Sequence, residues 1–484
     1  MEEIPMSTPL TREQKITHLL NRISFGPTRE EAARVDRLGF RAYLDEQLEP
    51  DRIADPYVEE KLAGLKTMRL SSRELIELYP LPRQAQQQAK QQQAQQQMSM
   101  LPMEMQGPRQ VILELQLARL LRSIYSRRQL YEIVVDFWSN HFNIFAGKGA
   151  DRWLTTAYDR DTIRPHALGR FGTLLRATAE SPAMLFYLDN WLSTGPDSPA
   201  SRVAAANNRR RGLNENYARE LMELHTLGVD GGYTQKDVHE VARCFTGWTI
   251  REPQKQGEFT FNPRMHDEGE KIVLGTRIPA TGVDEGLKVL DLLARHPSTA
   301  KFIATKLARR LVSDDPPVAI VSKAAATFRE TDGDIRAVLR TIIDSPEFFS
   351  EESYRAKVKK PVEYVASALR ATGAETKVPH QLVRYLARMG EPLFLAQPPT
   401  GFPDRGASWI SPDMLLTRMN FASDLVGNRL DGSRVRPELL SDSDAFVRLI
   451  APDSLAPATR AALGETEGKD AIALLMAAPE FQRR

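Results

Sequence analysis

The stretch Asn214-Glu-Asn-Tyr-Ala-Arg-Glu-Leu-Met-Glu-Leu-His-Thr-Leu-Gly228 decides which fold class the sequence predicts. At about 100° per residue, helical spacing brings Tyr217, Leu221 and Leu224 onto one apolar face. The asparagine at its start can cap the first turn, and the closing glycine can end the helix. We therefore predict one amphipathic helix over 214–228.

Another face of this predicted helix carries a polar row made of Asn216, Glu220 and Glu223. His225 lies on the edge of the apolar face, far around the helix from both carboxylates. One metal ion therefore cannot be bound by His225 together with both glutamates. The two glutamates can still share a metal ion or a proton with side chains of a facing helix.

Helical patterns continue outward from this stretch along most of the chain. Apolar residues recur with helical spacing over 111–142 and again towards the C-terminus. One region differs, because Phe259 and Phe261 alternate with polar residues, as they would in a strand. The predicted class is all-α, a mainly helical multi-helix assembly with a short β-hairpin insertion near 257–275.

The length of 484 residues is too great for one ordinary core. We expect an N-terminal helical region over 1–110, a central helical core over 111–350 that carries the motifs, and a C-terminal helical region over 351–484. The first region includes a Gln- and Met-rich insertion over 84–106. Because glutamine propagates a helix but supplies little apolar surface, the insertion reads as a poorly packed connector or lid, either helical or flexible.

The composition is that of an ordinary globular protein, with 42% hydrophobic and 26% charged residues. The 65 Lys and Arg residues nearly balance the 63 Asp and Glu residues, which gives no reason to expect a nucleic-acid partner. A single cysteine, Cys244, excludes a disulfide framework and a Cys-rich zinc site. The sequence shows no apolar run of the roughly 20 residues that span a bilayer and no signal-peptide pattern, so it predicts no membrane span and a cytoplasmic protein.

A second polar motif, Asp136-Phe-Trp-Ser-Asn-His-Phe-Asn143, ends a strongly apolar helix. It places His141 between the amides of Asn140 and Asn143. Burying such a cluster is costly unless its donors and acceptors are paired, and functional sites tolerate that cost. The motif is therefore a candidate site, although the same groups can also serve as buried struts between helices.

A third motif lies in the predicted helix at 235–246. Thr234 and Asp237 have the spacing of a capping box, and Glu240 and Arg243 have the spacing of a structural ion pair. His239 points away from the apolar face and is expected to be exposed.

Two further polar segments flank these helices. His266 and Asp267 lie in an expected loop, where a carboxylate can hold a neighbouring imidazole in one tautomer. Arg209-Arg-Arg211 can bind an anion near the following helix, or it is simply a solvated run of charge.

Several of these motifs together resemble the bacterial DUF 1800 family. The resemblance rests on Asn140-His-Phe-Asn143, on 214–228, on Gly232-Tyr-Thr-Gln-Lys-Asp-Val238 with Phe245-Thr-Gly-Trp248, and on His266-Asp-Glu-Gly-Glu-Lys271. It implies no particular activity. Members of that family often occur beside a second, sulfatase-like family, which implies a partner protein from that neighbouring family.

The leading hypothesis is an enzyme whose site forms where the Asn140 motif, the Glu220 helix and the His266 loop converge. Hydrolysis or elimination on a polar glycan or peptide substrate is the simplest chemistry, since no common nucleophile, nucleotide or zinc signature is present. The candidate catalytic residues are Glu215 and Glu220 as general base, with His141 and His266 as acid or metal ligand. The candidate substrate-binding residues are Asn140, Asn143, Asn216, Arg219, Asp267 and Trp248.

Two questions stay open at this point. A divalent metal ion would suit the carboxylates and imidazoles, but the sequence identifies no ligand set. The alternative class is a non-catalytic binding or scaffold protein, in which Glu215 pairs with Arg219 along the helix and the other polar residues join helices to one another.

Overall fold

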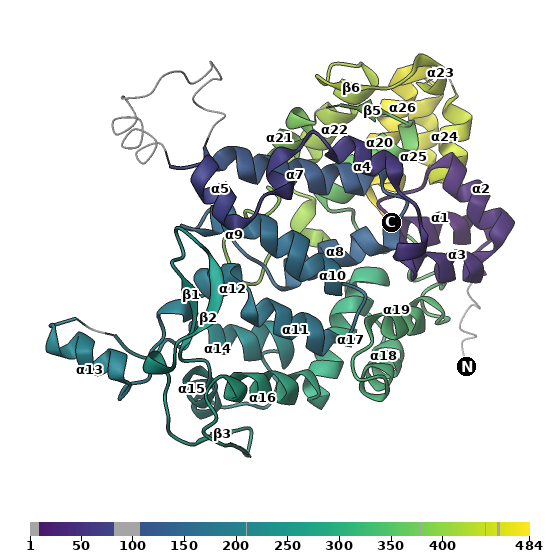
Figure 1. The fold of residues 1–484 in the computed structure, drawn as a ribbon. Helices are drawn as coiled ribbons and strands as arrows, with labels where there is room; N and C mark the ends of the chain where they lie inside the picture. The colour runs from purple at the N-terminus through teal and green to yellow at the C-terminus, as the bar shows by residue number, and fades with distance from the viewer. Residues whose placement is uncertain (1–8, 82–106, 210, 378, 441, 453–454) are drawn as a thin grey trace, which may run out of the picture.

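The computed structural model describes residues 9–81, 107–209, 211–377, 379–440, 442–452 and 455–484 (Figure 1). It confirms the predicted class, because helices predominate and the strands form only two-stranded sheets. The Gln- and Met-rich insertion over 84–106 lies outside the described residues, and its predicted character stays a prediction. No helix in the described ranges has both the length and the apolar character that crossing a bilayer requires.

The N-terminal part consists of short helices, drawn in purple in Figure 1. Thr11 caps the first of them, and Gln14 completes the capping box. Gly26 has φ +114° and approaches Ser367 so closely that a Cβ would come within 2.4 Å of the serine oxygen. Only glycine allows this contact. The elements are α1 (Arg12–Ile23), α2 (Arg29–Leu38), α3 (Phe40–Gln47), η1 (Pro50–Arg52), α4 (Pro56–Leu62), η2 (Lys66–Arg69) and α5 (Ser72–Leu78).

The central part begins with two long apolar helices and continues through shorter ones. Proline starts several of them, since its missing N–H is not needed in the first turn. The elements are α7 (Pro108–Tyr125), α8 (Gln129–His141), α9 (Asp151–Ala157), η4 (Tyr158–Ile163), α10 (Arg164–His166), α11 (Phe171–Glu180), α12 (Pro182–Tyr187), η5 (Asn190–Leu192), α13 (Pro199–Ala206), α14 (Asn216–Glu220), η6 (Leu221–Thr226) and α15 (Gln235–Cys244).

The segment predicted as one α-helix over 214–228 changes its hydrogen-bonding pattern half-way. It is α-helical only in α14, and η6 is a π-helix, in which the N–H of Leu227 reaches the carbonyl of Met222 at 2.8 Å. The wider π turn shifts the side chains away from the regular spacing that was used to place His225. Gly228, with φ +82°, ends the segment as expected.

The β-insertion contains two hairpins. β1 (Trp248–Arg251) pairs with β2 (Glu258–Phe261), and β3 (Lys271–Val273) pairs with β4 (Thr276–Ile278), both antiparallel. The strand with Phe259 and Phe261 therefore pairs with the strand before it and not with the one near 272. Both pairings close shorter loops than a pairing across 257–275 would, and shorter loops cost less chain entropy.

The remaining helices complete the lower part of the molecule in Figure 1 and then build the C-terminal part, drawn in light green and yellow. The elements are α16 (Val283–Ala294), α17 (Pro297–Leu311), α18 (Val318–Glu330), α19 (Ile335–Ile343), α20 (Pro361–Thr372), β5 (Glu375–Thr376), α21 (His380–Arg388), η8 (Gly406–Trp409), α22 (Pro412–Val426), β6 (Ser433–Arg434), α23 (Pro437–Leu440), α24 (Ser443–Ile450), α25 (Pro457–Leu463), α26 (Gly468–Ala477) and α27 (Pro479–Gln482).

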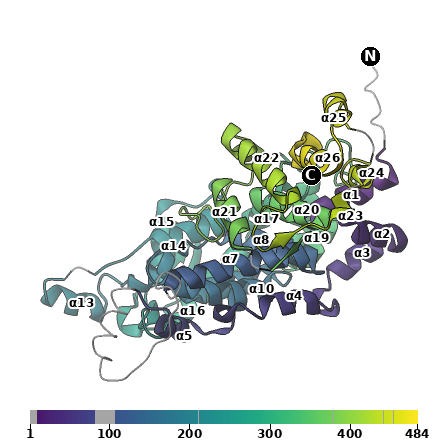
Figure 2. The same cartoon turned by 90° about the horizontal axis from the view of Figure 1, so that it is seen from above.

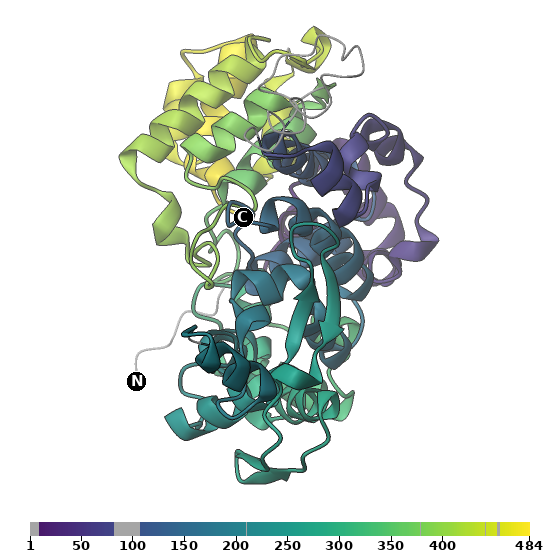
Figure 3. The same cartoon turned by 60° about the vertical axis from the view of Figure 1, so that its left-hand side comes forward.

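Helices α1 to α3 lie beside the C-terminal helices, and the β3–β4 hairpin lies at the opposite end of the molecule (Figures 1 and 3). Helix α13 stands apart from the main body in two perpendicular views (Figures 1 and 2).

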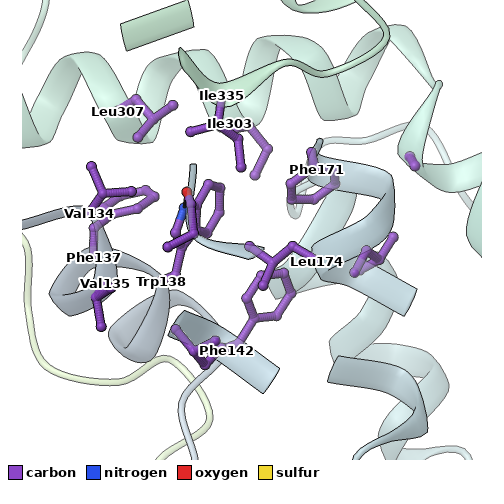
Figure 4. Packing of buried hydrophobic residues seen from close by; sticks show 14 of the residues in the cluster. Val134, Val135, Phe137, Trp138, Phe142, Phe171, Leu174, Ile303, Leu307 and Ile335 are labelled. Carbon is purple, nitrogen blue, oxygen red and sulfur yellow. Dashed lines mark hydrogen bonds between the residues drawn. The ribbon is translucent and has the colours of Figure 1, made fainter. Parts of the chain in front are cut away.

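Trp138 of α8 lies at the centre of the largest hydrophobic core. Figure 4 shows its ring among Phe142, Phe171 and Ile303, which come from three separate segments. Its indole Nε1 donates a hydrogen bond to the carbonyl of Ala167 at 3.0 Å, so the one polar atom of the ring is satisfied. This packing fixes the direction of α8, and α8 ends in the Asn140 motif.

Helix α7 contributes to three hydrophobic cores. Val111 belongs to the largest, Leu120 to a second core made mostly of C-terminal residues, and Leu121 to a small third core beside α4. The second core also takes Phe25 from the N-terminal part. The division at 110 and 350 stays a prediction, and shared cores of this kind favour cooperative folding across those boundaries.

Candidate active site

A small hollow lies where α7, α8, α9 and η4 meet the irregular segment over 391–402. Its volume is about 40 Å³, which holds a few water molecules. We call it the Glu391 hollow. Its polar lining consists of Arg119, Asp136, Ser139, Asn140, Asn143, Thr155, Tyr158, Asp159, Lys360 and Glu391.

Arg119 organises one wall of the hollow. Its guanidinium contacts Asp159 at 2.6 Å, Ser139 at 2.7 Å and Asp136 at 3.3 Å. Burial alone would raise the pKa of Asp159, but Arg119 and neighbouring arginines lower it. Asp159 is thereby held as a carboxylate in the interior, and it fixes the position of Arg119.

A second set of buried charges lies behind Asp136. Arg310 contacts Asp136 at 3.4 Å and forms an ion pair with Glu363, which also contacts Arg484 at 3.1 Å. Burial alone would raise the pKa of Glu363, yet Arg310 and Arg484 lower it to about 2. Asp136 itself contacts two arginines, Arg119 at 3.3 Å and Arg310 at 3.4 Å.

Glu391 differs from Asp136, Asp159 and Glu363 in that it has no ion-pair partner among the described residues. Its side chain is buried, and its Oε2 accepts a hydrogen bond from the backbone N–H of Val362 at 2.8 Å. Burial raises the pKa of Glu391 to about 8; the charge of Lys360 works against this shift, and the charge of Asp136 adds to it. At neutral pH this carboxyl group is therefore mostly protonated.

The backbone beside Glu391 is strained. Phe394 has φ +61°, a conformation that bulky side chains rarely adopt. Its carbonyl accepts a hydrogen bond from Ala146 at 3.0 Å, and its ring lies 5.1 Å from the guanidinium carbon of Arg119. A strained backbone of this kind persists only where the surrounding packing holds it in place, and such strain is concentrated at functional sites.

Asn140 and Asn143 hold the Pro- and Gly-rich segment over the hollow. The amide of Asn140 pairs with both backbone groups of Phe402, at 2.7 and 3.0 Å. Asn143 donates to the carbonyls of Ala396 and Pro398 at 3.0 and 2.9 Å. Both predicted substrate-binding amides thus lie at the hollow, and their hydrogen bonds position its rim.

His141 lies on the other side of α8, away from the hollow. It is buried, and its Nε2 lies 3.1 Å from the backbone oxygen of His225 in η6. Burial, with Lys306 adding to it, lowers the pKa of His141 well below its ordinary value. It is therefore a neutral imidazole between two motif segments.

Glu215 lies in a partly exposed polar cluster on α14 and α15. Its oxygens lie 3.5 Å from Arg219, 2.7 Å from Gln235 and 3.1 Å from His239, which is exposed as predicted. Asn216 of the same helix start donates to the carbonyl of Leu188 at 3.3 Å.

Glu220 is half-buried and stands apart from that cluster. Burial raises the pKa of Glu220, and the charge of Glu223 raises it further. Its charge also contributes to the raised pKa of Tyr187, whose hydroxyl donates to the carbonyl of Gln397 at 2.7 Å. Glu220 therefore lies near the anchored end of the segment that covers the hollow, without lining the hollow itself.

His266 and Asp267 lie in a separate neighbourhood at the β-insertion. The two ring nitrogens of His266 face the carbonyl of Thr246 at 2.8 Å and a carboxylate oxygen of Glu285 at 3.0 Å. Lys271 also contacts Glu285, at 2.5 Å. This buried triad fixes the start of β3.

Asp267 and Trp248 complete the same neighbourhood. Arg243 binds Asp267 at 2.9 Å and also forms the predicted pair with Glu240 at 3.0 Å, which is confirmed. Burial alone would raise the pKa of Asp267, but Arg243 lowers it. Trp248 is fully buried against Gly286. The predicted capping box of Thr234 and Asp237 is confirmed as well.

The structure therefore brings Asn140 and Asn143 to one hollow and distributes the other candidates over at least three neighbourhoods. Within the described residues no three His, Cys, Asp or Glu side chains gather as ligands of a metal ion would. No metal ligand set is assigned.

A protein-family model described as a protein of unknown function, DUF1800, matches residues 18–483. The chain belongs to the DUF1800 family. This confirms the resemblance drawn from the motifs. Comparison with curated proteins and with solved structures gives no match.

Sequence patterns of this DUF1800 chain did not single out the three carboxyl groups of the hollow, those of Asp136, Asp159 and Glu391. Asp136 opens the Asn140 motif, but a single aspartate within a helical stretch is also typical of an ordinary surface position. Glu391 stands between Gly390 and Pro392, which is typical of an exposed turn. Neither its burial nor its distant neighbours leave a local signal in the sequence.

Proposed function

We propose that this DUF1800 protein is a hydrolase or lyase that acts on a polar glycan or peptide substrate by general acid–base catalysis in the Glu391 hollow. The observation that carries the proposal is a buried carboxyl group, lining a hollow, with a pKa of about 8. Such a group is protonated at neutral pH and can donate its proton to a leaving oxygen or nitrogen.

Asp136 is the proposed partner base. It lines the same hollow and contacts Arg119 and Arg310. A carboxyl group that stays protonated, paired with a second carboxyl group in the same cavity, is a usual arrangement for acid–base chemistry. In hydrolysis, Asp136 would take a proton from water while the water oxygen attacks. The proton of Glu391 would go to the leaving group as its bond breaks.

The remaining polar lining would orient the substrate. Lys360 and Arg119 supply cationic donors for hydroxyl, carbonyl or carboxylate oxygens. Asn140 and Asn143 hold the segment over 396–402 that forms the rim. The hollow is small, so a substrate larger than a few atoms requires this segment to move outward.

The other candidates from the sequence form an alternative assignment, which competes with the Glu391 hollow. Glu215, Glu220, His141 and His266 would act as base, acid or metal ligand, and Asn216, Arg219, Asp267 and Trp248 would bind substrate. The cytoplasmic location and a sulfatase-like protein partner also stay proposals.

A substrate screen with matched variants tests the proposal. Chromogenic aryl glycosides and fluorogenic peptides are offered to the wild type, to Glu391→Gln and to Glu215→Gln. We expect Glu391→Gln to lower kcat of any activity found by about 100-fold or more, with little change for Glu215→Gln. Because the acid must be protonated, wild-type activity should fall as pH rises through about 8.

The opposite pattern would redirect the assignment. Full activity of folded Glu391→Gln together with loss in Glu215→Gln would place the chemistry on α14 and reject the hollow as the active site.

A scaffold role is the second candidate, and one observation favours it. The ion pairs that join Asp136, Arg310, Glu363 and Arg484 link α8 and α17 to the C-terminal part of the chain. A purely structural network would make Asp136→Asn strongly destabilising and would leave the screen without any activity.

A further inference from the structure

A groove runs beside helix α13, and it shares no lining residue with the Glu391 hollow. Two adjoining hollows of about 440 and 380 Å³ form it, and they share Arg211, Asn262 and Met265. One wall is α13, which stands apart from the body in Figures 1 and 2, and the other is the β1–β2 hairpin with η7 (Pro263–Met265).

The groove is positively charged. Arg209, Arg211, Arg251 and Arg264 line it, and all four are exposed. Its lining includes no Asp or Glu side chain. Within the described part of the chain the only ion contact of these arginines joins Arg251 to Glu258 at 3.8 Å. Four guanidinium groups with so little compensation favour an anionic ligand.

The same groove exposes apolar side chains. Leu192, which lines the first hollow, is 48% exposed, and Val203, which lines the second, is 53% exposed. Phe261, which is partly buried, and Met265, which is buried, also line the groove. A ligand that carried only acidic and hydroxyl groups would leave this apolar surface exposed to water.

We propose that the groove binds an acidic peptide segment of a partner protein, in which acidic and apolar side chains alternate. An extended peptide points successive side chains to opposite sides. Carboxylates can then meet the arginines while apolar side chains cover Leu192 and Val203. Guanidinium groups bind carboxylates through paired hydrogen bonds, which gives orientation as well as affinity.

The proposal does not depend on the acid–base chemistry. None of the groove residues lines the Glu391 hollow. Loss of peptide binding and loss of catalysis therefore report on different parts of the molecule.

Fluorescence anisotropy on the full chain tests the proposal. The probe is a fluorescein-labelled peptide of eight residues that alternates Asp or Glu with Leu. We expect the double variant Arg211→Glu/Arg264→Glu to weaken binding by about tenfold or more. Val203→Ser should weaken it several-fold, because it removes apolar contact without changing charge.

Matched controls separate this groove from nonspecific attraction. Arg41→Glu changes an exposed arginine of α3 outside the groove and should leave the affinity unchanged. A peptide with Ser in place of Leu should bind several-fold more weakly than the probe. All variants alter exposed residues, and circular dichroism checks that they fold.

Three results would overturn the proposal. Equal weakening by Arg41→Glu would mean that net charge alone attracts the probe. Equal affinity for the Leu and Ser peptides would show that the apolar surface plays no part. A sulfated polysaccharide that binds more tightly than the peptide, and loses affinity in the double variant, would assign the groove to a glycan.

Discussion

At the scale of single residues, the protonation of Glu391 follows from its surroundings. Its folded pKa is about 8 against an ordinary value of 4.5. The folded protein therefore binds a proton between these two pH values that the unfolded chain has lost. This contribution to stability is complete below pH 4.5 and disappears as pH rises through about 8.

Replacing Glu391 by glutamine should remove that pH dependence. Glutamine keeps an oxygen for the N–H of Val362 but cannot ionise. Relative to the wild type, Glu391→Gln should gain on the order of 3 kcal/mol of unfolding free energy between pH 5 and pH 9. Urea unfolding at both pH values measures the difference.

The exposed Glu59→Gln of α4 serves as control and should show no such gain. Identical pH profiles for Glu391→Gln and the wild type would contradict the raised pKa, and with it the role of Glu391 as proton donor.

At the scale of elements, the end of α8 holds an irregular segment in place. Asn140 satisfies both backbone groups of Phe402, and Gly401 lies so close that a Cβ would come within 2.6 Å of the Asn140 side-chain oxygen. The rim of the hollow therefore depends on one asparagine and one glycine with φ +70°.

Asn140→Ala should loosen this rim. Two partly buried backbone groups of Phe402 lose their partner, which costs about 1–3 kcal/mol. Hydrogen exchange over 397–406 should become faster, whereas exchange in α11 should stay the same. Asn207→Ala is the control, because that exposed side-chain amide donates to the carbonyl of Val203 in the adjacent helix α13. Unchanged exchange at Phe402 would show that other contacts hold the segment.

The contact between α16 and β1 is the second element that permits a sharp prediction. A Cβ on Gly286 would come within 2.6 Å of the buried ring of Trp248. Gly286→Ala should therefore destabilise the protein by about 1–3 kcal/mol, although alanine favours helix. Gly64→Ala meets nothing within 4 Å and should be neutral or slightly stabilising. Thermal unfolding compares the two, and equal Tm values would mean that α16 shifts at no cost.

At the scale of the whole molecule, three cores share helix α7. Leu120 is fully buried in the core that contains most C-terminal residues. Its truncation should therefore affect parts of the chain on both sides of 350, the predicted boundary between regions.

Leu120→Ala should lower the unfolding free energy by about 2–5 kcal/mol. We expect a single urea transition, seen at the same midpoint by far-ultraviolet circular dichroism and by tryptophan fluorescence. Two separate transitions, of which only one shifts, would instead support independent central and C-terminal domains.

The sequence by itself determined the helical class, the family, the capping box of Thr234 and the ion pair of Glu240 with Arg243. These depend on residues within a few positions of one another or on motifs spread along the whole chain. Local hydrogen bonds and amphipathic spacing carry such information directly.

Only the tertiary structure decided which polar residues share a site. The strand that contains Phe259 pairs with Trp248–Arg251, and the helix that contains Glu220 is followed directly by a π-helix. Glu391 lies buried in the same hollow as Asp136, although the two residues are far apart in the chain. Desolvation and charge depend on every segment that packs around a group, and no short pattern in the sequence encodes that environment.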